Sequence, residues 1–155
     1  MNCGMLRIPP KEVLMAITQL SLFLTNQPGA LVDAVSAISY TGANLRAMSI
    51  AEANDFGILR IIVTSTDKVY RQLSGQYLIS KTEVVAARMD DRSGALFPIL
   101  AALNEANINI EYMYAFTGSG AEEAYVVFRV NDVKTAEEVL NSRGIETLSD
   151  ENLNL

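Results

Sequence analysis

The sequence contains no histidine and only one cysteine, Cys3. The absence of histidine removes the commonest general base and, with a single cysteine, nearly every transition-metal site. One cysteine cannot form a disulfide within the chain, so a reducing environment removes no stabilising bond within the chain. We therefore expect no catalytic residue, no metal and no cofactor, and we expect a cytoplasmic location.

Long apolar runs are also absent. The longest strongly apolar stretch, residues 95–103, is interrupted by Pro98 and is far shorter than the roughly 20 residues that cross a bilayer. Charges and prolines break up residues 1–15, unlike a secretory signal, so we interpret this segment as an N-terminal extension. No membrane partner is expected.

The charge is negative overall, with a formal net value of -6 at pH 7, and the acidic excess lies in residues 81–155. Such a surface repels polyanions, so no nucleic-acid partner is expected. Half of the residues are apolar, which is enough to bury a core.

Two stretches of the chain repeat one another. Residues 25–50 read TNQPGALVDAVSAISYTGANLRAMSI, and residues 90–115 read DDRSGALFPILAALNEANINIEYMYA. They align without a gap, and their apolar periodicities coincide, which indicates a duplicated structural unit. The identical positions are Gly29 and Gly94, Ala30 and Ala95, Leu31 and Leu96, Ala37 and Ala102, Asn44 and Asn109, and Met48 and Met113.

Each copy begins with a strand and a helix. Alternating or clustered apolar residues predict strands over residues 17–25 and 83–89. In the helices that follow, apolar residues at helical spacing predict one stripe that packs on a sheet. The first helix is expected to end at Gly42 and the second at Asn107, because glycine and asparagine suit the left-handed backbone of a helix C-terminus. The stripe residues are Leu31, Val35 and Ile38 in the first copy, and Leu96, Leu100 and Leu103 in the second.

Each copy continues with a hairpin, a short helix and a last strand. The hairpins join residues 45–51 to 57–65 and residues 110–116 to 124–130, through the turns EANDFG and TGSGAEE. The helices are expected over residues 67–75 and 132–143. Residues 78–89, LISKTEVVAARM, fuse the last strand of the first copy to the first strand of the second.

The order βαββαβ, found twice, predicts an α+β fold in which two helices cover one face of each four-stranded antiparallel sheet. We expect domains over residues 16–82 and 83–149, and a tail over 150–155. Each unit is small, and one sheet edge per copy would stay unpaired. The copies are therefore expected to associate side by side, within the chain or between chains, most simply as a homodimer.

The turn NQPGAL suits a type II turn in which Pro28 sets φ and Gly29 supplies a positive φ. An ordinary turn is one interpretation. In DRSGAL, however, Ser93 replaces the proline while Gly94 remains. Because each turn leads into a helix whose first amides lack partners, and glycine lets a ligand approach the backbone, a carboxylate is the natural occupant.

Two further features accompany these turns. Pro98 lies in or just after the first turn of its helix, where it indicates a late start to the regular helix or simply a proline near a helix start. Asn44 and Asn109 begin the second strand of each copy, where their amides make a local turn contact or meet the other end of a zwitterion.

These residues resemble tandem ACT domains, which have the ferredoxin-like βαββαβ order and a first turn of the form Asp/Asn-x-Pro-Gly followed by a small residue and leucine. The stretches ANLRAMSIAEANDFGILRIIV and NINIEYMYAF look like the stand-alone two-ACT proteins of bacteria. The resemblance spans about residues 16–149. It implies a free amino acid bound between the first turn of one unit and the early second strand of its neighbour.

Residue by residue, the resemblance implies one ligand site in each copy. The departure of Ser93 from proline implies that the two sites are not equivalent. The residues are Asn26, Pro28, Gly29, Ala30, Leu31 and Asn44 in the first copy, and Asp91, Ser93, Gly94, Ala95, Leu96 and Asn109 in the second.

The resulting hypothesis is a non-enzymatic sensor that binds a free amino acid at interfaces between ACT units and modulates its own assembly or a partner, such as a metabolic enzyme or a regulator. Two alternatives remain at this stage. One is a structural oligomerisation module without a ligand, and the other is a small enzyme on a ferredoxin-like fold.

Overall fold

The computed structural model describes residues 16–117 and 123–154. The chain first forms β1 (Ile17–Thr25), α1 (Ala30–Tyr40), β2 (Leu45–Ala53), β3 (Phe56–Val63) and α2 (Thr66–Leu73). It continues with β4 (Leu78–Asp90), α3 (Leu96–Glu105), β5 (Ile110–Thr117), β6 (Glu123–Val130), α4 (Val133–Ser142), β7 (Thr147–Leu148) and the 3-10 helix η1 (Asp150–Asn154). The predicted α+β order is confirmed, while most of the predicted second hairpin turn, residues 118–122, lies outside the described residues.

The strand order is β2-β3-β1-β4-β6-β5, with β7 also paired to β4, and all pairs are antiparallel. The predicted fusion of two strands is confirmed, because β4 is one uninterrupted strand. Its residues 78–84 pair with β1, and residues 85–90 pair with β6. We call β1 to the first part of β4 unit one, and the rest of β4 to β7 unit two. The predicted domain boundary between residues 82 and 83 falls inside β4 and stays a prediction.

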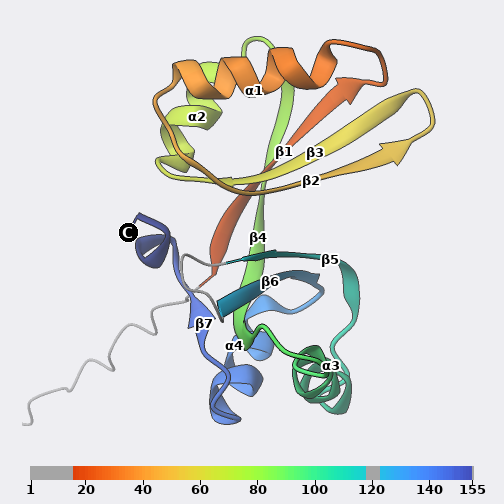
Figure 1. Ribbon diagram of the computed structural model, residues 1–155, viewed down its shortest axis with the longest axis vertical. Helices are drawn as coiled ribbons and strands as arrows, with labels where there is room; N and C mark the ends of the chain where they lie inside the picture. Colours follow the sequence, from red (N-terminus) through yellow and green to blue (C-terminus); the bar gives the residue numbers. More distant parts are fainter. Residues whose placement is uncertain (1–15, 118–122, 155) are drawn as a thin grey trace, which may run out of the picture.

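Each unit has its own core between its helices and its sheet. Figure 1 shows α1 and α2 against one sheet at the top, α3 and α4 beneath the other, and β4 running between them. Leu20, Leu22 and Leu24 alternate along β1 toward the helices of unit one. Val126, Phe128 and Val130 alternate in the same way along β6 in unit two. The period of two places one apolar row under each helix pair.

A third apolar cluster lies where the helix-free faces of the two sheets meet. It contains Ile17, Ala47 and Ile62 from unit one, and Val127 and Leu148 from unit two. The prediction of side-by-side association is therefore right only in part. β4 links the sheets through hydrogen bonds, but the sheets also pack face to face, because helices cover only one face of each and the other face is apolar as well.

A buried polar network crosses this sheet-to-sheet interface. Gln19 is completely buried, and its Nε2 donates to the Tyr112 hydroxyl at 2.8 Å and to Ser21 Oγ at 3.1 Å. The Tyr114 hydroxyl donates to Gln19 Oε1 at 2.9 Å. The Arg60 guanidinium lies 3.8 Å from the centre of the Tyr112 ring. Burial raises the pKa of Tyr114, so this hydroxyl stays a donor at neutral pH.

The predicted helix ends are confirmed. Gly42 and Asn107 follow α1 and α3 with φ values of 75° and 57°. The predicted stripe on the first helix is right at Ile38, which is buried, and wrong at Leu31, which is 38% exposed; Ala34 is buried in addition. Alanines let the helix approach the sheet closely, so the larger Leu31 is displaced to the rim of the contact.

Candidate functional site

The two turns of the repeat have the same backbone. Gly29 and Gly94 have φ values of 93° and 82°. In the first turn the Ala30 N–H donates to the Gln27 C=O at 3.3 Å, and in the second the Ala95 N–H donates to the Arg92 C=O at 3.2 Å. The predicted hydrogen-bonded turn, with a positive φ at glycine, is thus confirmed in the first copy and recurs in the second without its proline.

These bonds determine which backbone groups precede the helices. The amides of Ala30 and Ala95 are used inside the turns, whereas the Asp33 N–H makes the first regular bond of α1, to the Gly29 C=O at 3.0 Å. Helix α3 begins one repeat position later than α1, at Leu96, with Pro98 as its third residue. Pro98 thus lies in the first turn of α3, where a missing N–H is tolerated, and both interpretations of this proline stay open. A Cβ at Gly29 or Gly94 would meet no heavy atom of the described residues within 4 Å, apart from chain neighbours.

Asn44 and Asn109 precede β2 and β5, and each hydrogen-bonds a residue that follows the neighbouring strand, β3 or β6. The Asn44 N–H donates to Thr64 Oγ1 at 2.8 Å, and its C=O accepts from the Thr64 N–H at 3.0 Å. The Asn109 N–H donates to Asn131 Oδ1 at 3.0 Å, and its C=O accepts from the Asn131 N–H at 3.3 Å. The local-contact interpretation holds for both backbones. Both side chains are exposed, and their role toward a ligand stays a prediction.

Within one unit, the turn and the asparagine lie at opposite ends of the sheet. The Asn26 N–H donates to the Asp55 C=O at 3.1 Å, so the first turn lies beside the β2-β3 hairpin. Asn44 precedes the other end of β2, a strand of nine residues that spans roughly 25 Å. A ligand that contacts both a first turn and the start of a second strand must therefore contact the turn of one unit and the strand of the other.

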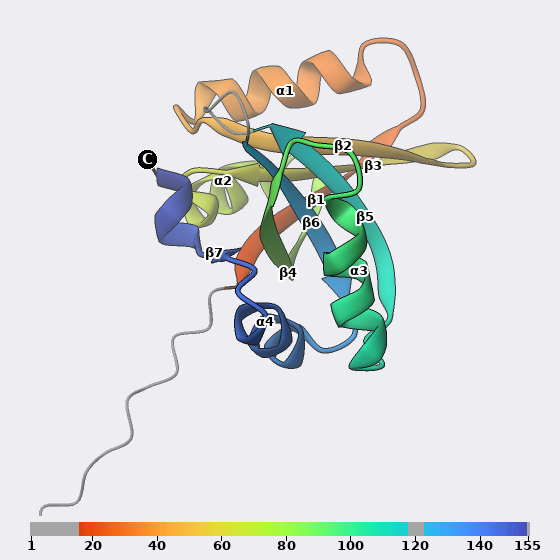
Figure 2. The same ribbon diagram turned by 60° about the horizontal axis from the view of Figure 1, so that its bottom comes forward.

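The fold provides such a meeting place, which we call the interunit groove. It has a volume of about 700 Å³ and lies between the start of β2 in unit one and the first turn of unit two. Figure 2 shows the end of β5, which also lines the groove, against β2. The lining residues are Leu45, Arg46, Ala47, Met48, Met89, Asp91, Ala115, Phe116, Thr117 and Ala124.

Of the twelve predicted site residues, Asp91 lines this groove. Asn44 immediately precedes its β2 wall, and residues 93–96 continue from Asp91 toward α3. Asn26 and residues 28–31 lie beside the hairpin of unit one, and Asn109 precedes β5. The structure thus brings part of the second-copy turn to the first-copy strand, and the full set stays a prediction.

Opposite charges line the interunit groove, because it contains both Arg46 and Asp91. Arg46 is half-buried and Asp91 is exposed. Two further arginines lie near the groove in ion pairs: Arg92 Nε lies 3.0 Å from Asp90 Oδ2, and Arg88 pairs with Glu123 and Glu146. The Glu146 and Glu123 carboxylates raise the pKa of Arg88. Arg46 and Asp91 are the charged residues among those that line the groove.

The sequence reasoning missed Arg46 and the apolar wall of the groove. Met48, Met89 and Phe116 line it, although they come from strands far apart in the sequence. One signal was present, because Met48 is identical to Met113 at the aligned position of the repeat. That identity alone does not distinguish a groove residue from a conserved packing position.

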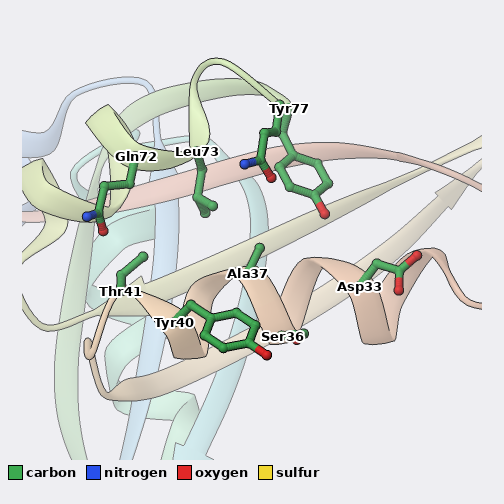
Figure 3. A pocket seen from close by; sticks show the side chains of 9 residues that line it. Asp33, Ser36, Ala37, Tyr40, Thr41, Gln72, Leu73 and Tyr77 are labelled. Atoms are coloured by element: carbon green, nitrogen blue, oxygen red, sulfur yellow. The ribbon is translucent and has the colours of Figure 1, made fainter.

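A second hollow, of about 570 Å³, lies between α1 and α2 (Figure 3). Its side chains come from both helices and from the segment before β4, and Tyr40 at its rim is 89% exposed. Asp33 is its one charged residue, so it offers no counterpart for the carboxylate of an amino acid. It is lined by Asp33, Ser36, Ala37, Tyr40, Thr41, Gln72, Leu73, Gln76 and Tyr77.

Across the described parts of the chain, no group of three or more histidine, cysteine, aspartate or glutamate side chains is placed to hold a metal ion. None of the helices in those parts is long and apolar enough to cross a membrane.

Comparisons with known proteins agree with this architecture. A model of the ACT domain pair matches residues 15–155. The crystal structure of protein BT0572 from Bacteroides thetaiotaomicron is 36% identical over 90% of this chain and 96% of that chain, with a TM-score of 0.83. The regulatory subunits of aspartate kinase from Thermus thermophilus and Thermus flavus share the fold.

The Thermus thermophilus subunit is 14% identical, with 84% of this chain and 93% of that chain covered and a TM-score of 0.62. The Thermus flavus subunit is 11% identical, with 83% and 90% covered and a TM-score of 0.59. None of the curated proteins matches the sequence. The matched family model and the identity to BT0572 show that this chain belongs to the family of ACT domain pairs.

Proposed function

We propose that this chain is a non-enzymatic sensor that binds a free amino acid in the interunit groove. The observation that carries the proposal is the position of Arg46 and Asp91 in one groove, at the start of β2 and the first turn of unit two. A free amino acid carries a carboxylate and an ammonium group. A guanidinium binds the carboxylate, and an aspartate binds the ammonium.

The groove fits this role in size and in place. Its volume of about 700 Å³ lies within the roughly 300–1,000 Å³ of small-molecule pockets. Because both units line it, a bound ligand stabilises one arrangement of the units by its differential affinity. Through that change the module would act on a partner, such as a metabolic enzyme or a regulator, in the cytoplasm.

Homodimerisation is part of the proposal. The strands β2 and β5 end the strand order, and Ile50 on β2 is 51% exposed. An unpaired edge with apolar side chains favours pairing with a second copy. The same observation favours the second candidate function, an oligomerisation module without a ligand, and a binding measurement separates the two.

Isothermal titration calorimetry of the full chain against the individual free amino acids tests the proposal. At least one is expected to bind with a dissociation constant in the micromolar to millimolar range, about -8 to -4 kcal/mol. Arg46→Gln and Asp91→Asn should each weaken that binding about tenfold or more, because each removes a charged hydrogen bond.

Lys134→Gln is the matched control for the loss of a charge. Lys134 lies on α4, which follows the end of β6. Ala124, the β6 residue that lines the groove, is near the other end of that strand. The Lys134→Gln variant should bind the amino acid with the same affinity as the unchanged protein. If no amino acid binds at millimolar concentration, the sensor function is wrong and the structural module is favoured.

A further inference from the structure

The wall of the interunit groove between its two charges is apolar. Met48, Met89 and Phe116 supply large side chains, and Ala47, Ala115 and Ala124 supply small ones. Met48 is 41% exposed, so it offers apolar surface that is available to a ligand. Burying this surface against an apolar ligand group is favourable in free energy, whereas burying a charged or strongly polar group against it is unfavourable.

We infer that the groove selects amino acids with apolar side chains of medium size, such as leucine and methionine. This inference rests on the proposed function and assigns its ligand class. Arg46 and Asp91 hold the two groups that all amino acids share, so the discrimination comes from Met48, Met89 and Phe116. The two methionines are unbranched and adaptable, which suits flexible apolar ligands of differing shape.

The strand that carries Met48 is irregular just before it. The pairing of β2 with β3 shifts register between Leu45 and Ala47. A bulge of this kind changes which face of the sheet the following side chains occupy. Ala47 packs in the cluster between the sheets, whereas Met48, the next residue along the edge strand β2, is 41% exposed and lines the groove.

Two charges and an apolar wall give distinct expectations for ligand analogues. Leucine and methionine should bind about tenfold more tightly than alanine, because each buried methylene contributes about fourfold and the groove is open. Aspartate and lysine should bind more weakly than leucine. Isoamylamine, which lacks the carboxylate of leucine, and 4-methylpentanoate, which lacks its amine, should each bind at least tenfold more weakly.

Met48→Ala tests the apolar wall, with Met113→Ala as its matched control. The two methionines occupy aligned positions of the repeat and are 41% and 38% exposed, and Met113 does not line the groove. Met48→Ala should reduce the preference for leucine over alanine about fourfold, the equivalent of one methylene. Met113→Ala should leave that preference unchanged.

Calorimetry of the full chain with leucine, methionine, alanine, aspartate and lysine distinguishes the outcomes. Equal affinities for all five would overturn the ligand class and leave the sensor function standing. Equal losses of preference in Met48→Ala and Met113→Ala would also overturn the assignment of selectivity to this groove. Failure of every amino acid to bind would instead overturn the proposed function on which the inference rests.

Discussion

Gly29 and Gly94 show how a single residue determines the shape of the turn before a helix. Both have positive φ, and in both turns the residue after the glycine donates to the carbonyl three positions before it. Pro28 occupies the preceding position in one turn and Ser93 in the other, so proline is dispensable for this shape while glycine is not. The left-handed region is costly for residues that carry a Cβ.

Gly29→Ala and Gly94→Ala should each lower the free energy of unfolding by about 1–2 kcal/mol. A clash is not the cause, because a Cβ at either position has open space. Gly75→Ala is the control, since its Cβ also has open space and its φ is not positive. Urea denaturation measures all three. A loss at Gly75 as large as at Gly29 would contradict the backbone explanation.

The helices show what an element contributes beyond its apolar pattern. The α1 pattern correctly predicted a helix that packs on a sheet, but it placed Leu31 under the helix. The structure keeps the predicted Ile38 there and adds Ala34, while Leu31 is exposed. A helical period determines which residues share a face, and small side chains then decide which part of that face approaches the sheet most closely.

Helix α4 supplies a prediction about pH at the scale of one element. The Asp132 carboxylate accepts from the Thr135 N–H at 3.0 Å and from the Thr135 hydroxyl at 2.7 Å. These bonds lower the pKa of Asp132 below its ordinary value of 3.8. A lowered folded-state pKa gives stability that is present above pH 3.8 and is lost as the pH falls through the folded-state value.

Asp132→Asn should therefore make the protein less stable at pH 6, because asparagine keeps the capping oxygen but not the charge that favours a helix N-terminus. The difference from the unchanged protein should shrink as the pH falls below 3.8. Urea denaturation between pH 6 and pH 3 measures it. A difference that stays constant over this range would show that the charge is not responsible.

At the scale of the whole molecule, the interface between the sheets contains both an apolar cluster and a polar network. Gln19 is completely buried, and its amide contacts Ser21, Tyr112 and Tyr114. A buried amide without partners is costly, so this network favours the one arrangement of the units in which all its groups are paired.

Tyr114→Phe should lower the free energy of unfolding by about 1–3 kcal/mol, because it leaves Gln19 Oε1 without its donor. In a Gln19→Leu background the same change should cost less, since the acceptor is already gone. Urea denaturation of the four proteins gives this double-mutant cycle. Equal costs in both backgrounds would show that the hydrogen bond contributes nothing to the interface.

The sequence by itself determined the duplicated βαββαβ order, the fusion within β4, the glycine turns and the helix ends at Gly42 and Asn107. Each of these depends on local periodicity or on the backbone preference of one residue. Only the tertiary structure decided that the helix-free faces pack together and that Arg46 lies in one groove with Asp91. Those contacts join strands far apart in the chain, and no local preference specifies which distant faces meet.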